Sequence, residues 1–140
     1  MADTPLLAVD RLTTRFFTSR GVVGAVEGIS FEVAPGEAVG IVGESGSGKS
    51  MTALSVLRLV PIPGRIVGGE VRYRGRNLLS LSDGEMRVVR QRDIAMVFQD
   101  ASSFLNPIIR VGDQIAEGIA ADGLSAADVR AKVLRSEEHT

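Results

Sequence analysis

The sequence predicts an α/β fold with an antiparallel β portion at its N-terminus, and three features support this prediction. Residues 6–17 mix apolar residues with threonine, and residues 29–33 alternate apolar and polar side chains, both of which are typical of half-buried strands. Residues 38–42 and 94–98 are short, continuously apolar runs, the pattern of strands buried on both faces of a parallel sheet. The other segments space their apolar residues as helices do, so helices and strands alternate in the second half.

The elements expected before the first helix are strands and turns. We expect a strand from Leu6 to Phe17 and two further strands over 22–26 and 28–33. Pro35 and Gly36 form a turn that leads into the apolar strand over 38–42.

The rest of the chain is expected to be mainly helical. The pattern predicts a helix over 49–59, an edge strand over 69–73, a helix over 83–92, a strand over 94–98, and helices over 111–121 and 125–134. Pro61 and Pro63 end the first helix. Ser82, with Glu85 three residues later, predicts a capping box, and Ser125 is expected to cap the last helix.

Composition excludes several classes of function. The 140 residues suit one domain, 44% of them are hydrophobic, and the formal net charge of -1 argues against a nucleic-acid partner. The chain has no cysteine and its one histidine is His139, which excludes disulfide, zinc-thiolate, iron–sulfur, cysteine-nucleophile and multi-histidine sites. No apolar run approaches the roughly 18 residues of a membrane span, and the N-terminus lacks signal-peptide features. We therefore expect a cytosolic protein that meets a membrane only through a partner.

The most specific motif is GESGSGKS at residues 43–50, which fits the phosphate-binding pattern G-x-x-x-x-G-K-[ST] between an apolar strand and a helix. Gly43, Gly46 and Gly48 let the backbone curl so that its N–H groups point at a polyphosphate. Lys49 supplies charge for the β- and γ-phosphates, and the Ser50 hydroxyl suits Mg²⁺. The alternatives are a chance glycine-rich turn or a dinucleotide-binding loop, but the latter leaves Lys49 unexplained.

Two segments carry a resemblance to a known family. GEAVGIVGESGSGKSMT, followed by IAMVFQDASSFLNP and a GDQIAE run, resembles the ATP-binding subunits of ABC transporters, and more narrowly the oligopeptide, dipeptide and nickel importer group. The resemblance covers residues 6–134. It implies a P-loop NTPase fold of the ABC type, truncated, with the antiparallel portion, the start of the parallel-sheet core and part of the helical subdomain.

The resemblance also implies the site residues, with ATP and Mg²⁺ as cofactors. The nucleotide-binding residues would be Phe16, Gly43, Glu44, Ser45, Gly46, Ser47, Gly48, Lys49, Ser50 and Met51. Lys49 and Gln99 would be catalytic, and Ser50 and Gln99 would bind Mg²⁺. Phe16 would stack on adenine, although Phe17 is adjacent and either ring could be an ordinary strand aromatic. Read without the family, Gln99 would be a surface residue at a strand end.

The implied partners are those of a solute importer for peptides, nickel or a related solute. They are a second nucleotide-binding subunit, permease subunits that contact Asp100 to Pro107, and indirectly a periplasmic or extracellular solute-binding protein. This places the protein on the cytoplasmic face of a bacterial plasma membrane. Ala101, Phe104 and Met51 depart from residues common in the group.

The chain lacks the family's other hydrolysis motifs. It contains no LSGGQ-type signature, no apolar strand ending in Asp-Glu after residue 100, and no switch histidine. We therefore expect residues 1–134 to be the N-terminal part of a nucleotide-binding domain. RSEEHT at 135–140 resembles a translated sequencing adapter, and its alternative reading is a polar, frayed end. Without partner strands for residues 38–42, we expect this chain to be poorly soluble or partly folded.

Three functional hypotheses follow. The first is that the intact protein is a transport-coupled ATPase. The second is a half-domain that binds nucleotide without hydrolysing it. The third is a different P-loop NTPase, such as a GTPase or a small-molecule kinase, although the N-K-x-D motif of a GTPase is absent.

Overall fold

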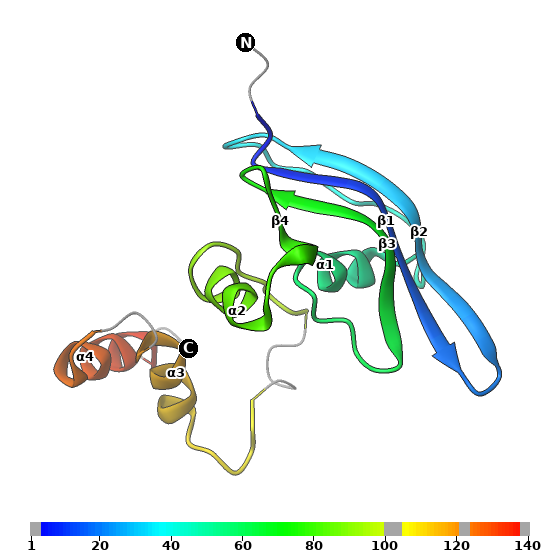
Figure 1. Ribbon diagram of the computed structural model, residues 1–140. Coiled ribbons are helices and arrows are strands. Elements are labelled where there is room, and N and C mark those ends of the chain that lie inside the picture. The colour runs from blue at the N-terminus through cyan, green and yellow to red at the C-terminus, as the bar shows by residue number, and fades with distance from the viewer. Residues whose placement is uncertain (1–3, 100–104, 121–123, 138–140) are drawn as a thin grey trace. The chain divides into compact units, whose positions relative to one another are not determined.

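The computed structural model describes residues 4–99, 105–120 and 124–137 (Figure 1). Its internal contacts divide the chain into two compact units, Met1–Arg90 and Gln91–Thr140. Residues 1–3, 100–104, 121–123 and 138–140, which include His139, Ala101 and Phe104, lie outside the described residues. No helix in the described ranges is both long and apolar enough to cross a membrane.

The first unit is built on a four-stranded antiparallel sheet with the strand order β2-β1-β3-β4. Its strands are β1 (Leu7–Thr18), β2 (Gly21–Val33), β3 (Gly64–Tyr73) and β4 (Arg76–Asn77). This sheet confirms the predicted antiparallel portion. The two strands expected over 22–26 and 28–33 are one strand, because Gly28, at φ 62, lies at an irregularity of the β1–β2 pairing and does not end it.

The central strand β1 carries a bulge at Arg11. Arg11 has a φ of 46, and its backbone N–H donates to the Ser30 hydroxyl at 2.8 Å. The extra residue shifts the register between Val9 and Leu12, so both side chains are buried, at 3% and 0% exposed. Strand β3 begins at Gly64, earlier than the predicted residue 69, because residues 64–66 also pair with β1.

Three helical segments lie or begin in the first unit. They are α1 (Lys49–Val56), the short 3₁₀ helix η1 (Leu78–Ser80) and α2 (Asp83–Arg92). The predicted capping box is confirmed, since the Glu85 N–H donates to the Ser82 hydroxyl at 3.3 Å and Glu85 Oε2 accepts from the Ser82 N–H at 2.9 Å. The core of the unit consists of Val9, Leu12, Val26, Val56, Leu57, Val71, Leu78, Leu81, Met86 and Val89.

Helix α1 ends earlier than predicted, in a Schellman motif built on an arginine. The Leu59 N–H donates to the Leu54 carbonyl at 2.8 Å, and the Arg58 N–H donates to the Ser55 carbonyl at 3.1 Å. Arg58 has a φ of 53, a conformation that glycine usually supplies at this position. Its guanidinium donates to the Leu81 carbonyl at 2.6 Å and to Asp83 at 3.0 Å, which holds this turn in place.

The second unit holds α3 (Val111–Ala120) and α4 (Ala126–Glu137), which contact each other. The predicted cap of the last helix is confirmed, because the Asp128 N–H donates to the Ser125 hydroxyl at 3.3 Å. Helix α4 continues through Arg135 and Ser136, past the predicted end at residue 134.

The two apolar runs that predicted parallel strands form no strand. In the part of the chain that the structure describes, neither 38–42 nor 94–98 belongs to a strand of the sheet. A strand forms only where its backbone meets a neighbouring strand, so apolar composition alone does not produce one. Val42 is 97% exposed and Val97 is 92% exposed.

Candidate nucleotide-binding site

The glycine-rich loop, residues 43–50, leads directly into α1. Gly48 is the N-cap of this helix, with φ 93 and ψ 4, and Lys49 is its first residue. Gly46 has a φ of 82, so two glycines of the loop adopt left-handed backbone that other residues rarely occupy. The first turn of α1 contains no acidic residue. Its free N–H groups and the positive end of its dipole therefore favour an anion at this end.

The loop packs closely against strand β2 at Gly48. A Cβ atom on Gly48 would lie 2.2 Å from the carbonyl oxygen of Ala25. A Cβ atom on Gly43 would lie 2.6 Å from the Ser47 hydroxyl oxygen. Glycine at position 48 is therefore required by its contact with the β2 backbone, before any ligand is considered. At Gly43 the nearby atom is the end of the Ser47 side chain, which can rotate away.

The Lys49 side chain reaches back across the loop. Its Nζ donates to the carbonyl oxygens of Gly43 at 2.8 Å and Glu44 at 2.6 Å, with Ser47 Oγ at 3.4 Å. The ammonium group is thus held over the loop, where it faces the oxygens of the protein itself. An ammonium is a point charge on a flexible stem, so these neutral acceptors can be exchanged for the charged oxygens of a phosphate.

The remaining predicted loop residues are placed by the loop and the first turn of α1. Glu44, Ser45 and Ser50 are exposed, while Met51 is half-buried. Thr52 fixes the junction, since its N–H and its hydroxyl donate to the Gly48 carbonyl at 2.8 and 3.0 Å. Ser50, two residues before Thr52, is thus exposed in the first turn of α1. A hydroxyl oxygen suits Mg²⁺ when the other ligands are phosphates and water.

A hollow of about 350 Å³ lies between the loop and β2. It is lined by Gly46, Ser47 and Thr52 on one side and by Gly24, Ala25, Val26, Glu27 and Ile29 on the other. The hollow adjoins the loop. Its first lining residue in β2 is Gly24, which follows Val23, the cross-strand partner of Phe16.

The two aromatic candidates point to opposite faces of β1. Phe16 lies on the same face of β1 as Thr14, which contacts Ser55 of α1. The Phe16 ring packs against Gly64, where an added Cβ atom would lie 2.9 Å from two ring atoms. Phe17 lies on the other face, where the Arg65 guanidinium is 5.8 Å from its ring centroid. Phe16 is therefore on the face that carries the glycine-rich loop and Phe17 is not.

The second unit contains the other predicted site residue, Gln99, and a second glutamine that holds the loop beyond it. Gln99 lies at an exposed bend after residues 94–98, and Asp100 with residues 101–104 lies outside the described residues. Gln114 of α3 holds the loop just beyond them: its Oε1 accepts from the Asn106 N–H at 2.8 Å, and its Nε2 donates to the Asn106 and Ile109 carbonyls at 3.1 and 2.9 Å. Its signal in the sequence was its place in the GDQIAE run.

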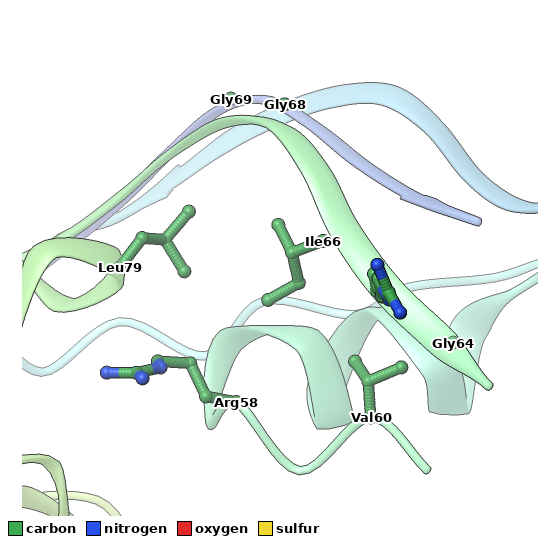
Figure 2. Close-up of a pocket in the computed structure, with 8 residues that line it drawn as sticks. Arg58, Val60, Gly64, Ile66, Gly68, Gly69 and Leu79 are labelled. Atoms are coloured by element: carbon green, nitrogen blue, oxygen red, sulfur yellow. The ribbon is translucent and has the colours of Figure 1, made fainter. Parts of the chain in front are cut away.

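A second hollow of the first unit, of about 390 Å³, lies between β3 and the segment after α1. Figure 2 shows it lined by the side chains of Arg58, Val60, Ile66 and Leu79 and by the backbone at Gly64, Gly68 and Gly69. None of the predicted site residues lines it. The described residues also contain no group of three or more His, Cys, Asp or Glu side chains that could hold a metal ion.

Comparison with known proteins places this geometry in a family. The sequence pattern of the ABC transporter family matches residues 26–139. A probable peptide ABC transporter ATP-binding protein of Sinorhizobium fredii is 50% identical over 131 residues, which are 92% of this chain and 39% of that protein. The oligopeptide transport ATP-binding protein OppD of Bacillus subtilis is 45% identical over 115 residues, 81% of this chain and 32% of that protein.

Solved structures agree at the level of the fold. The ATP-binding cassette MJ0796, solved as a dimer in a post-hydrolysis state with ADP and Pi, has a TM-score of 0.77 at 23% identity. The match covers 92% of this chain and 54% of that one. The chain thus spans well under half the length of the two curated relatives and about half of the solved cassette.

Proposed function

We propose that this chain, which belongs to the ATP-binding domains of the ABC transporter family, binds ATP with Mg²⁺ through the loop at residues 43–50. The observation that carries the proposal is the complete loop at the start of α1, with Lys49 held across it. The backbone of Glu44, Ser45, Gly46 and Ser47 would surround the phosphates, and Met51 would follow in the first turn. Lys49 would neutralise charge on the β- and γ-phosphates.

Mg²⁺ would be bound by the Ser50 hydroxyl, with phosphate oxygens and water as its other ligands. The exposed side chain of Ser50 at the second position of α1 suits this arrangement. When bound, the ion neutralises charge on the phosphates. We assign Gln99 as the second protein contact with Mg²⁺ and with an attacking water, because a neutral amide both donates and accepts hydrogen bonds.

The proposal is tested by titrating the 140-residue chain with ATP and Mg²⁺ in a calorimeter. Lys49→Ala should weaken binding about tenfold to a hundredfold, the effect of losing a hydrogen bond between charged partners. Lys132→Ala is the matched control, because Lys132 is the other lysine of the sequence and lies in α4 of the second unit. Equal affinities for Lys49→Ala and the unchanged chain would contradict the proposal.

Phe16 is the proposed contact for the adenine base. It lies on the α1 face of the sheet beside Gly64, whereas Phe17 is on the opposite face against Arg65. Phe16→Ala should therefore weaken ATP binding about fivefold and remove the preference for ATP over GTP. Phe17→Ala, a neighbouring change of the same size, should leave both unchanged. The reverse result would move the assignment to Phe17.

In the whole protein, we propose that ATP binding and hydrolysis power the import of peptides. The names of the similar proteins support this solute class, since they describe peptide, oligopeptide and dipeptide transport. The partners would be a second nucleotide-binding subunit and permease subunits that contact residues 100–107, with a solute-binding protein acting through the permeases. The protein would then sit at the cytoplasmic face of the membrane.

The solute is tested in cells that lack the gene of the whole protein. Loss of labelled dipeptide and oligopeptide uptake, with nickel uptake retained, is the expected result. Loss of nickel uptake alone would contradict the peptide assignment and would identify nickel as the solute.

The 140-residue chain by itself should bind ATP without hydrolysing it. Lys49 and Gln99 are its only catalytic candidates, and a phosphate-binding loop does not by itself supply a base for the attacking water. A steady release of phosphate from ATP that disappears in Lys49→Ala would contradict this expectation.

A further inference from the structure

Two buried hydroxyl groups connect the antiparallel sheet to α1. Thr14 of β1 and Ser55 of α1 are both fully buried, at 0% exposed, and their hydroxyl oxygens lie 2.8 Å apart. Ser55 Oγ also donates to the Met51 carbonyl at 2.7 Å. A hydroxyl has one proton, so Thr14 must donate to Ser55 and Ser55 to Met51. The chain of hydrogen bonds therefore runs in a defined direction from the strand into the first turn of the helix.

The pair joins the two elements that carry the proposed ATP contacts, strand β1 and helix α1. Thr14 lies two residues before Phe16 on the same face of β1. Met51, which accepts the last hydrogen bond, directly follows Lys49 and Ser50 in α1. The pair thus connects the strand of the base contact with the helix of the phosphate contact.

A second attachment lies at the start of the same helix. Gly48 packs on the Ala25 carbonyl of β2, and Ala25 is two residues from Val23, the cross-strand partner of Phe16. The sheet therefore contacts α1 at both ends: backbone on backbone at Gly48, and hydroxyl on hydroxyl at Ser55. Close packing of backbones fixes a distance, while a buried hydrogen bond also fixes a direction. Of these two contacts, the hydroxyl pair is the one that fixes a direction as well as a distance.

We infer that Thr14 and Ser55 are positioning residues that set the spacing between the base contact at Phe16 and the phosphate loop. This inference rests on the proposed function, because it needs both contacts to be real. A ligand held at two sites gains affinity from the second only when the spacing of the sites matches its length. The pair should therefore matter for ATP, which reaches both contacts, and not for inorganic tripolyphosphate, which reaches only the loop.

The test compares the dissociation constants of ATP and inorganic tripolyphosphate, with Mg²⁺, in Thr14→Val. This change keeps the shape of the side chain and removes the donor. ATP binding should weaken about fivefold, as expected for the loss of one buried hydrogen bond, while tripolyphosphate binding changes less than about twofold. Thr14→Ser, which keeps the hydroxyl, should restore ATP binding. In a Phe16→Ala background, Thr14→Val should have no further effect on ATP.

Two controls separate positioning from stability and from the proposed function. Val9→Ala removes buried volume from the same strand, so it should lower the unfolding temperature without changing the ratio of the two constants. Ser55→Ala is the second variant, and it should change the ratio as Thr14→Val does.

An unchanged ratio in both variants overturns the inference while ATP binding stands. The inference is also overturned if both variants fail to fold while Val9→Ala folds, because the pair then serves stability alone. Absence of ATP binding by the unchanged chain overturns the proposed function instead.

Discussion

Gly48 and Ala25 are in such close contact that a Cβ atom on Gly48 would lie 2.2 Å from the Ala25 carbonyl oxygen. Gly48 also has a φ of 93. Two features therefore require glycine at the N-cap of α1: the left-handed backbone of Gly48 and its contact with strand β2. The glycine that the phosphate-binding pattern requires is also the point at which the loop is fixed to the sheet.

Gly48→Ala is expected to unfold the loop region as well as to abolish nucleotide binding. The added methyl group can be accommodated only if the loop moves away from β2, and Cβ contacts near 2.2 Å do not occur in folded proteins. Thermal unfolding of the variant, followed by circular dichroism, should show a lower midpoint than the unchanged chain.

Gly75→Ala is the control for this change. Gly75 has a similar φ of 79, but a Cβ there meets nothing within 4 Å, so only the backbone strain of about 1 kcal/mol remains. Equal destabilisation in the two variants would show that the contact with Ala25 is unimportant.

The loop itself could be predicted from the sequence, because its residue types and spacing are dictated by local backbone geometry and phosphate chemistry. The role of Ala25 could not, since it depends on how β2 lies behind the loop. The same holds for the Schellman motif at Arg58: the pattern pointed to Pro61 as the end of α1, and no glycine marked the earlier end. Hydrogen bonds from Arg58 to Leu81 and Asp83 stabilise that turn from a distant part of the chain.

The sequence pattern predicted the antiparallel strands, but it also predicted strands over 38–42 and 94–98 that the described residues do not form. Residues 7–33 form two strands joined by a short turn, and the sequence pattern located both, although it divided the second at Gly28. Residues 38–42 and 94–98 have the composition of buried strands, but composition does not supply a neighbouring strand. The sequence also could not decide between Phe16 and Phe17 as the base contact. The structure separates them, because Phe16 lies against Gly64 and Phe17 lies near Arg65 on the opposite face.

Gln114→Ala is expected to loosen the loop that precedes α3. The Gln114 side chain accepts one hydrogen bond from the Asn106 N–H and donates two to loop carbonyls. The amide hydrogen of Asn106 should therefore exchange with solvent about tenfold faster in the variant, measured by NMR. Gln91→Ala, at an exposed glutamine, is the control. Unchanged exchange at Asn106 would mean that the loop holds its shape without Gln114.

The capping box of α2 makes stability depend on pH in the acid range. Hydrogen bonds from the Ser82 hydroxyl and backbone N–H, with a smaller effect of the Arg76 guanidinium, lower the pKa of Glu85 from its ordinary value of 4.5. A carboxylate with a lowered folded pKa stabilises the fold fully above its unfolded pKa, and this contribution is lost as pH falls through the folded pKa.

Glu85→Gln should therefore flatten the dependence of the unfolding temperature on pH below about 4.5 and lower that temperature at neutral pH. Glu32→Gln removes the same charge from an exposed position in β2, and it should leave the acid part of the curve as it is. If the unfolding temperatures of Glu85→Gln and the unchanged chain fall in parallel below about pH 4.5, other groups cause the loss of stability in acid.

The apolar run at residues 38–42 is expected to make this chain self-associate. Val39 is 43%, Ile41 is 48% and Val42 is 97% exposed, and the backbone of the run pairs with no strand in the described residues. An extended apolar segment with free N–H and C=O groups can pair with the same segment of another molecule. Val42→Glu should therefore raise the monomer fraction in analytical ultracentrifugation, because a buried carboxylate disfavours such a pair while an exposed one costs nothing in the monomer. Ser19→Glu adds the same charge at an exposed turn, and an equal gain there would attribute the effect to net charge alone. A sharp cooperative melt of a monomeric unchanged chain would contradict the expectation from the start.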